Sequence, residues 1–496
     1  MNRARHAMPH RGARRGVLCR FALPGITLVV LSGCAMLHHD SGPVAQLDAE
    51  QAQLAPTVAV MAGDWPSKDW WQSLHDPQLT AFVERALTAS PTMQQARQRV
   101  SEAHARAELA VAVSGLQLSA IGTIDRERVS SHGFLSAYSV SQPAIGASGP
   151  WYTTGLVGFN GSWDIDIWGL HRAQIDAAIG VENARKTEVA EVALELSADV
   201  ASVYYSAQTA LSTVALLTEE KDAIDTEVDA HRWRFSRGLE PKTLLEQAQS
   251  RLATVEQQIE QTSETAKDDE ETLRALIGAG PGEPMTIEAR PLPAYAAGVP
   301  ANLGFQLLAR RPDLQALHWY VDASLKSVNA AKAAFYPNFD IKAFFGFDAL
   351  DLSQLFLHAS QQINIAPGLY LPIFDGGRLN ANLHEVRASS NALILQYNQA
   401  VLNAVRDVAQ IGSTLKSLDA RTALQRQKLD AAEYTLASAA AQYDRGLADK
   451  LQVAQARESA IDTRVAMLGL SGNSLQEAIA MTKALGGGYD EAAPSG

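Results

Sequence analysis

Two very long stretches without proline constrain this chain more than any other feature of its sequence. Ala173 to Ser236 contains one glycine, Gly180, and Leu379 to Asp444 contains one glycine, Gly412. As helices rising 1.5 Å per residue, each would be about 90–100 Å long, whereas the average helix has about 11–12 residues. Two interpretations fit: a solvated coiled-coil hairpin, or a wall of helices packed through small residues spaced three and four apart.

The two stretches belong to an internal repeat. An offset of 208 residues places Arg-Gly-Leu at 237–239 on Arg-Gly-Leu at 445–447. Further upstream the better offset is 221, which pairs Pro91 with Pro312. The first half therefore carries additional residues, and we place them in the Ser/Gly/Pro-rich stretch Val129 to Pro150, which we expect to be a loop.

Four segments of alternating apolar and polar residues lie between the helical regions. In residues 157–167, for example, Phe159 and Trp163 share one face, while Asn160 and Asp164 share the other. Strands that cross an outer membrane have about this length and this alternation. A half-buried sheet in a soluble protein gives the same pattern. The four predicted strands are residues 116–125, 157–167, 339–348 and 362–373.

If these strands lie in a membrane, one chain does not suffice. An open sheet edge in lipid leaves backbone groups unpaired at several kcal/mol each, and the smallest membrane barrels have about eight strands. Four strands must therefore share a closed barrel with strands of identical chains. Two, three or four copies would meet this requirement.

The N-terminus has the layout of a secretory signal. Residues 1–20 hold six arginines and no acid, and Phe21 to Leu31 is an apolar run. The following Leu-Ser-Gly-Cys, which ends at Cys34, resembles the bacterial lipobox. The resemblance implies an S-diacylglycerol and an N-palmitoyl group on Cys34, and Ala35 after it favours the outer membrane. The alternative is an ordinary signal peptide. Either way, Cys19 is removed with the signal.

Composition and motifs exclude several other classes of protein. The formal net charge is -12, which disfavours nucleic-acid binding because phosphates attract a basic surface. No run approaches the 18 apolar residues that a membrane-spanning helix needs. The histidines show no metal-ligand spacing, and the glycines at 486–488 lack the lysine of a phosphate loop. We predict no enzyme, no metal and no cofactor.

Motifs spread over nearly the whole chain resemble the TolC/OprM-type outer-membrane factors, and more closely the NodT-like lipoproteins of bacterial efflux systems. Two of them, around Arg310 and Asp375, are highly specific in this setting. The motifs are Trp70-Trp71, Asp76-Pro77-Gln78-Leu79, Ser162-Trp163-Asp164-Ile165-Asp166-Ile167-Trp168-Gly169, Arg310-Arg311-Pro312-Asp313, Tyr336-Pro337-Asn338, Leu371-Pro372-Ile373-Phe374-Asp375-Gly376-Gly377-Arg378 and Lys483-Ala484-Leu485-Gly486-Gly487-Gly488.

The resemblance implies a mainly α fold with membrane β: two repeats of long helices plus four β-strands per chain. A homotrimer would form a 12-stranded β-barrel, continued by an α-helical barrel and a mixed equatorial belt. The implied partners are a periplasmic adaptor (membrane fusion protein), an inner-membrane efflux pump and outer-membrane lipid. The expected function is a passive exit duct for small toxic compounds or drugs. Alternatives are a TolC-like duct for protein secretion and a lipid-tethered periplasmic coiled-coil scaffold.

The resemblance also assigns roles to the hairpin turns, which would contact the adaptor and narrow the tunnel. A candidate gate consists of Arg445, Asp449 and Lys450, whose salt bridges to neighbouring copies would hold the tunnel shut. The alternative is a purely structural turn. Pro241 and Leu244 depart from the family pattern near the first turn. The six predicted turn residues are Arg237, Gly238, Leu239, Arg445, Gly446 and Leu447.

These features together predict a division of the chain into eight segments. They are a lipoprotein signal peptide (1–33), an acylated N-terminal and equatorial segment with the first helix (34–112), a strand pair with an outer loop (113–168), the long helices and turn of repeat 1 (169–290), an equatorial connection with the first helix of repeat 2 (291–335), a second strand pair (336–376), the long helices and turn of repeat 2 (377–485) and a C-terminal tail (486–496).

Overall fold

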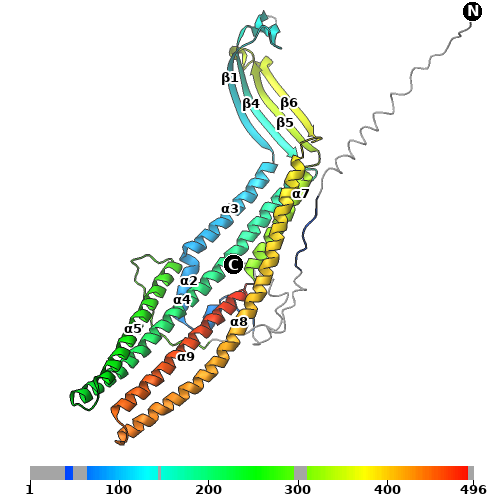
Figure 1. Ribbon diagram of the computed structural model, residues 1–496. Helices are drawn as coiled ribbons and strands as arrows, with labels where there is room; N and C mark the ends of the chain where they lie inside the picture. The colour runs from blue at the N-terminus through cyan, green and yellow to red at the C-terminus, as the bar shows by residue number, and fades with distance from the viewer. Residues whose placement is uncertain (1–39, 48–63, 143–146, 295–309, 490–496) are drawn as a thin grey trace, which may run out of the picture. The chain divides into compact units, whose positions relative to one another are not determined.

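The computed structural model describes residues 40–47, 64–142, 147–294 and 310–489 (Figure 1). The predicted signal peptide and Cys34 lie outside the described residues. The chain divides into two compact units. Unit 1 includes residues 108–177 and 324–391, and unit 2 includes residues 44–107, 178–323 and 392–496.

Unit 1 contains a four-stranded antiparallel sheet in the order β1-β4-β5-β6 (Figure 1). The four predicted strands are confirmed, with ends shifted by a few residues. The strands are β1 (Gln117–Arg128), β4 (Trp151–Ile165), β5 (Asn338–Ala349) and β6 (Gln361–Tyr370).

The strand register aligns the apolar faces of all four strands. Ala120 of β1 pairs with Phe159 of β4, Phe159 with Phe345 of β5, and Phe345 with Ile363 of β6. Because side chains alternate across a strand, the next row along carries the opposite face of the sheet. That row runs through Ser119, Asn160, Phe344 and Asn364. One face of the sheet is therefore continuously apolar, and the other is mixed and mostly polar.

The connection between β1 and β4 is more structured than the expected loop. It contains the short 3-10 helix η4 (Ser136–Ser139) and the two-residue strands β2 (Ser141–Gln142) and β3 (Ala147–Ser148), which pair with each other. The shorter connection between β5 and β6 contains η6 (Leu352–Gln354) and η7 (His358–Ser360).

The long helices confirm the internal repeat. The offset of 208 residues holds at both ends of two helix pairs, and α3 and α7 both begin at the prolines paired by the offset of 221. Both proline-free stretches form single helices of 67 residues, each followed by a helix of 35 residues. The helices are α3 (Pro91–Ser114), α4 (Leu170–Ser236), α5 (Lys242–Leu276), α7 (Pro312–Ala333), α8 (Arg378–Asp444) and α9 (Lys450–Ala484).

The region before α3 holds two further elements, η3 (Trp70–Leu74) and α2 (Pro77–Ala89). The sequence predicts a single first helix within residues 34–112. The structure breaks it at Ser90, which has ψ of 132°, because a residue before proline is pushed out of the helical conformation.

The largest described core lies in unit 2, where η3 and α2 pack against α4. Trp70, Leu79 and Val83 are at most 1% exposed, and Tyr204 and Tyr205 of α4 are equally buried. The buried area of such large apolar and aromatic side chains dominates the stability of a core.

Two of the sequence motifs make polar contacts within unit 2. Asp76 caps α2 by accepting from the backbone of Gln78, and it also accepts a hydrogen bond of 2.8 Å from the Tyr204 hydroxyl. Arg311 donates to the carbonyl of Ala484 at 3.1 Å. This carbonyl lies at the end of α9, where backbone carbonyls have no hydrogen-bond partner within the helix. Both motifs therefore have structural roles.

Candidate functional site

The two helical hairpins of unit 2 end in turns of the same geometry. Residues 237–239 lie in the connection between α4 and α5, and residues 445–447 lie in the connection between α8 and α9. Gly238 and Gly446 both have φ of +70°, a left-handed backbone that glycine adopts without steric cost. In each turn, the leucine after the glycine donates its N–H across the turn at 2.9 Å, as in a Schellman motif. The predicted turns are thus confirmed as turns.

A short network of ion pairs joins the first turn to the start of α9. Arg234 Nη1 lies 2.7 Å from Glu240 Oε1, and Arg234 Nη2 lies 2.7 Å from Asp449 Oδ2. His231 Nδ1 lies 2.7 Å from the other carboxylate oxygen of Glu240. The side chains of Arg234 and Asp449 are 27% and 48% exposed. Arg234 therefore bridges the two hairpins at the surface.

The network favours the charged forms of Asp449, Glu240 and Arg234. The backbone N–H of Gln452 and the guanidinium of Arg234 lower the pKa of Asp449. Hydrogen bonds from His231 and then from Arg234 lower the pKa of Glu240. The two carboxylates in turn raise the pKa of Arg234.

The three residues of the predicted gate lie at the second turn, and one of them joins this network. Asp449 Oδ1 accepts from the backbone of Gln452 at 2.9 Å and so caps α9, while Oδ2 pairs with Arg234. Arg445 and Lys450 are exposed. Within the described part of the chain, no ion pair involves either of them.

Arg234 and Glu240, which complete the network, were not predicted from the sequence. Asp449 carries a local signal, because an aspartate three residues before a glutamine fits a helix N-cap. The pairing of Arg234 with Asp449 has no local signal, since the two residues lie 215 positions apart.

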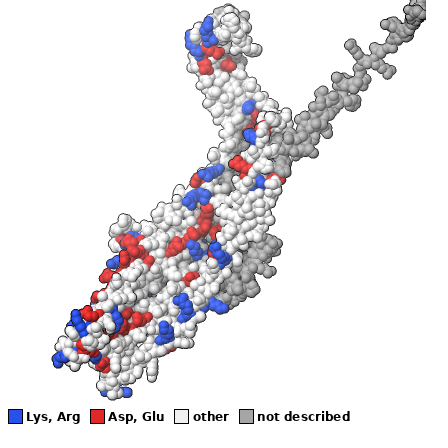
Figure 2. Space-filling view, in the orientation of Figure 1, with Lys and Arg blue, Asp and Glu red and all other residues white. Residues whose placement is uncertain are grey.

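Exposed apolar side chains surround both turns. Arg237 lies over the Trp233 ring at 5.0 Å, and the ring itself is 54% exposed. Figure 2 shows charged residues gathered at the same end of the hairpins. Aromatic residues and arginine are enriched in protein interfaces, so this end fits contact with another protein. The exposed apolar residues are Trp233, Phe235, Leu239, Tyr443 and Leu447.

The sheet of unit 1 provides a second surface of functional interest. Phe159, Ile363 and Ile365 on its apolar face are 53%, 65% and 71% exposed. Figure 2 shows few charged residues over the middle of the strands. An exposed apolar surface that continues over four strands marks an interaction with protein or lipid.

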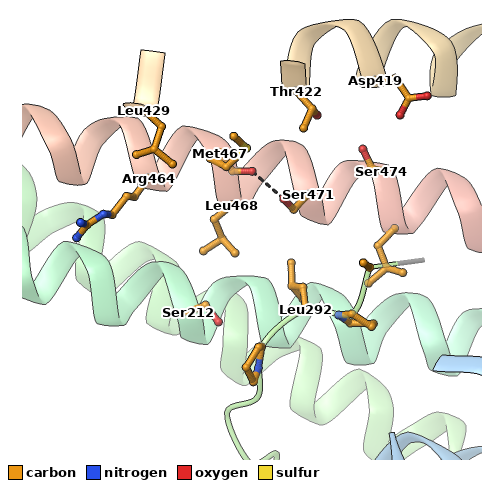
Figure 3. A pocket seen from close by; sticks show the side chains of 14 residues that line it. Ser212, Leu292, Asp419, Thr422, Leu429, Arg464, Met467, Leu468, Ser471 and Ser474 are labelled. Carbon is orange, nitrogen blue, oxygen red and sulfur yellow. Dashed lines mark hydrogen bonds between the residues drawn. The ribbon is translucent and has the colours of Figure 1, made fainter. Parts of the chain in front are cut away.

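Unit 2 also contains a cavity of about 660 Å³ between α4, α8 and α9 (Figure 3). Its lining is mainly apolar, with Met467, Leu468 and Leu292 on its walls. Ser471 donates to the Met467 carbonyl at 3.1 Å, and Arg464 pairs with Glu433 at 3.0 Å. The lining shows no pairing of a nucleophile with a base, so the cavity does not indicate catalysis.

The described residues offer neither a metal site nor a helix that spans a membrane. Among them, no group of His, Cys, Asp or Glu side chains could hold a metal ion. None of the described helices is long and apolar enough to cross a membrane.

Comparison with known proteins identifies the family. The model of the outer membrane efflux protein family matches residues 82–279 and 303–487. The chain belongs to the outer membrane efflux protein family. The predicted resemblance is thereby confirmed, and the chain is an outer-membrane efflux channel and no enzyme.

Relatives and solved structures agree with this assignment of the efflux channel. The chain is 44% identical to the multidrug resistance outer membrane protein MdtP of Shigella flexneri, over 98% of this chain and 99% of that protein. It is 37% identical to MdtQ of Escherichia coli O6:H1, over 93% and 96% of the two chains.

The fold of the efflux channel is that of solved outer-membrane channels. The crystal structure of the outer membrane protein VceC from Vibrio cholerae matches with a TM-score of 0.76 and 29% identity, over 86% of this chain and 100% of that one. The CmeC outer membrane channel of Campylobacter jejuni matches with a TM-score of 0.80 and 17% identity, over 92% and 95%. The expected mainly helical fold with few strands is confirmed.

Proposed function

We propose that this efflux channel works as a lipid-anchored homotrimer that forms the exit duct of a tripartite export system. Three copies would each contribute β1, β4, β5 and β6 to a closed barrel of twelve strands. The long helices of the three copies would form the periplasmic tunnel. Transport would be passive, with energy and most of the selectivity supplied by an inner-membrane pump.

The apolar face of the sheet is the observation that carries this proposal. Within the described residues, β1 and β6 each pair with one strand only, so the sheet has two free edges. Free edges in lipid would cost several kcal/mol per unpaired backbone group. Pairing of β6 with β1 of the next copy removes both edges and turns the apolar face towards lipid.

A matched pair of substitutions tests this placement. Ile363 and Asn364 are neighbours on β6, both exposed in one chain, and they lie on opposite faces of the sheet. Ile363→Arg puts a charge on the lipid face at a cost of up to about 2–4 kcal/mol, whereas Asn364→Arg faces the aqueous interior. We expect loss of heat-modifiable, outer-membrane trimer in the first variant only. Equal behaviour of the two variants would refute the barrel.

The exported compounds are proposed from the relatives. Both MdtP and MdtQ are named multidrug resistance outer membrane proteins, which favours small toxic compounds over secreted proteins as cargo. Deletion of the gene followed by a broad toxicity screen tests this choice. Sensitivity to several unrelated small compounds supports it, and an unchanged profile with a lost secreted protein would favour the secretion duct.

The lipid anchor at Cys34 remains part of the proposal. Asp40, six residues further on, is held by Arg387 at 2.7 Å and by Lys332 at 2.6 Å. This contact supports a short tether between the acylated residue and the helices of unit 1. Labelling with radioactive palmitate, with Cys34→Ser as the control, tests the anchor directly.

The hairpin turns are proposed as the adaptor contact and as the narrow part of the tunnel. Arg237, Leu239 and Leu447 offer exposed apolar and basic groups for the adaptor. Arg445 and Lys450 would face neighbouring copies, while the Arg234–Asp449 pair would tie the two hairpins of each copy together. An adaptor that competes for these charges would release the hairpins and open the tunnel.

A further inference from the structure

Two glutamates lie on the buried face of α4, about four turns and two turns before its end. Glu220 is 5% exposed and Glu227 is 0% exposed. Apolar residues of the same face, including Ile224 and Val228, surround them. Glutamates are rarely buried to this degree unless they are paired, so their partners decide how they behave.

Side chains from α5 and α9 face these glutamates. Arg251 of α5 donates to Glu227, and its Nε lies 3.7 Å from Glu458 Oε1 of α9. The charges of the exposed Asp462 and of Glu458, both on α9, also act on Glu220. We call these five residues the carboxyl cluster: Glu220, Glu227, Arg251, Glu458 and Asp462.

The surroundings offer the cluster no further described cation. Lys221 of α4 is engaged with Asp225 and with Glu256 of α5. Towards the turn, His231 pairs with Glu240. Arg251 therefore pairs with Glu227 and Glu458 of the cluster, and the charges that act on Glu220 are those of Asp462 and Glu458.

Two of the four carboxyl groups, Glu220 and Glu227, are buried. Burial and neighbouring carboxylates both disfavour the ionised form of such a group, so the site favours proton binding. Burial, followed by the charges of Asp462 and Glu458, raises the pKa of Glu220 to about 7. Burial also raises the pKa of Glu458.

One atom of Glu227 has surroundings that favour proton binding. Glu227 Oε1 is fully buried, and no hydrogen-bond partner for it exists among the described residues. Glu458 is a neighbouring acid, and the proximity of Glu227 raises its pKa. A buried acceptor without a donor favours a proton on such a neighbour.

The cluster lies where the two hairpins of the chain meet. Glu220, Glu227 and Arg251 belong to the α4–α5 hairpin, and Glu458 and Asp462 belong to α9 of the other hairpin. We propose that the carboxyl cluster is a proton-controlled contact between the hairpins, which holds α9 against α4 when protonated and repels it when ionised.

The sign of the pH dependence follows from the raised pKa. A carboxyl whose pKa is raised in the packed state favours packing fully at pH values below its ordinary value near 4.5. That contribution disappears as the pH rises through about 7. The hairpins are therefore held together under acidic conditions and separate more readily above neutral pH. The effect on conduction rests on the proposed function, but the movement of the hairpins does not.

Spin labels on the two turns test the movement. The full-length protein carries labels at Arg237→Cys and Arg445→Cys, and labelled chains are diluted with unlabelled ones so that distances within one chain are measured. Wild-type protein treated with the same label gives the background. Between pH 5 and pH 8.5 we expect the distance distribution to widen with a midpoint near pH 7. A distribution that does not respond to pH overturns the proposal.

Glu220→Gln tests the assignment to the cluster, because glutamine has the shape of the protonated acid without its titration. We expect the narrow distribution to persist at pH 8 and the midpoint to move by more than one pH unit. The matched control is Glu191→Gln, since burial also raises the pKa of Glu191 to about 7, but the charges that act on it lie outside the cluster and belong to Asp313, Glu195, Glu188 and Arg311. Equal effects of both variants refute the assignment.

A second variant and a second measurement separate the possible failures. Asp462→Asn alters an exposed member of the cluster and serves if Glu220→Gln does not fold. Conductance of the same preparations is recorded in planar bilayers. If the hairpins separate as the pH rises but the protein never conducts, the exit duct is refuted and the proton-controlled contact is supported. Conduction with hairpins that ignore pH would refute only the contact.

Discussion

Replacement of Asp449 by asparagine isolates the ion pair that bridges the two hairpins. Asparagine caps a helix about as well as aspartate, so the hydrogen bond to Gln452 survives and α9 keeps its first turn. The change removes the negative charge that faces Arg234 at 2.7 Å. The substitution therefore removes the ion pair between the hairpins and leaves the N-cap of α9 in place.

The expected magnitude follows from the exposure of the pair. With side chains 27% and 48% exposed, one pair contributes about 0.5 kcal/mol, within the range measured for surface ion pairs. Three copies in the proposed trimer give about 1.5 kcal/mol, which is about a tenfold increase in the ratio of open to closed tunnels at 25 °C. High salt should reduce the difference, because it screens exposed charges.

Single-channel conductance in planar bilayers measures that ratio. The matched control is Asp229→Asn, which removes a comparable exposed pair with Arg232 on the same helix without crossing between hairpins. We expect the tenfold increase for Asp449→Asn and no change for the control. An unchanged open fraction in both variants, or an equal increase in both, would refute the role of the bridge.

Three further predictions concern stability and are measured by thermal or denaturant unfolding of the purified protein. Asp76→Ala removes the cap of α2 and leaves the buried Tyr204 hydroxyl with only its longer hydrogen bond, 3.3 Å to Gln78 Oε1, so we expect a loss of about 2 kcal/mol, with a smaller loss for Asp76→Asn. Gly446→Ala forces φ of +70° on alanine and should cost about 1–2 kcal/mol; Gly469→Ala, inside α9 and facing open space, should instead stabilise by up to about 1 kcal/mol. Arg311→Ala removes the hydrogen bond to the end of α9 and should cost about 1 kcal/mol; no loss would mean that water replaces the guanidinium.

The sequence predicted the elements whose signals are local. The absence of proline from Ala173 to Ser236 allows one continuous helix over that stretch, and the structure has one. The four alternating segments became strands for a similar reason, since a two-residue period is a property of the segment itself. Gly238 and Gly446 were recognisable as turn residues because few other residues adopt their backbone conformation.

Features that depend on distant residues were not predictable in this way. Glu220 resembles any surface glutamate in the sequence, and its burial depends on side chains of α5 and of α9, far away in the chain. The ion pair of Arg234 depends on Asp449, which lies beside it only in the folded chain. The break before Pro91 did have a local signal, the proline itself, which the helical pattern on both sides concealed.

The matched lengths of the two hairpins constrain how this protein can evolve or be engineered. Each residue added to one helix would advance its turn by 1.5 Å and rotate it by about 100°, which would carry Arg234 away from Asp449. An insertion in one repeat is therefore tolerated only with a compensating insertion in the other. Chimaeras that borrow a single hairpin from a relative should work when the donor has 67 and 35 residues in the two helices, whatever its sequence similarity.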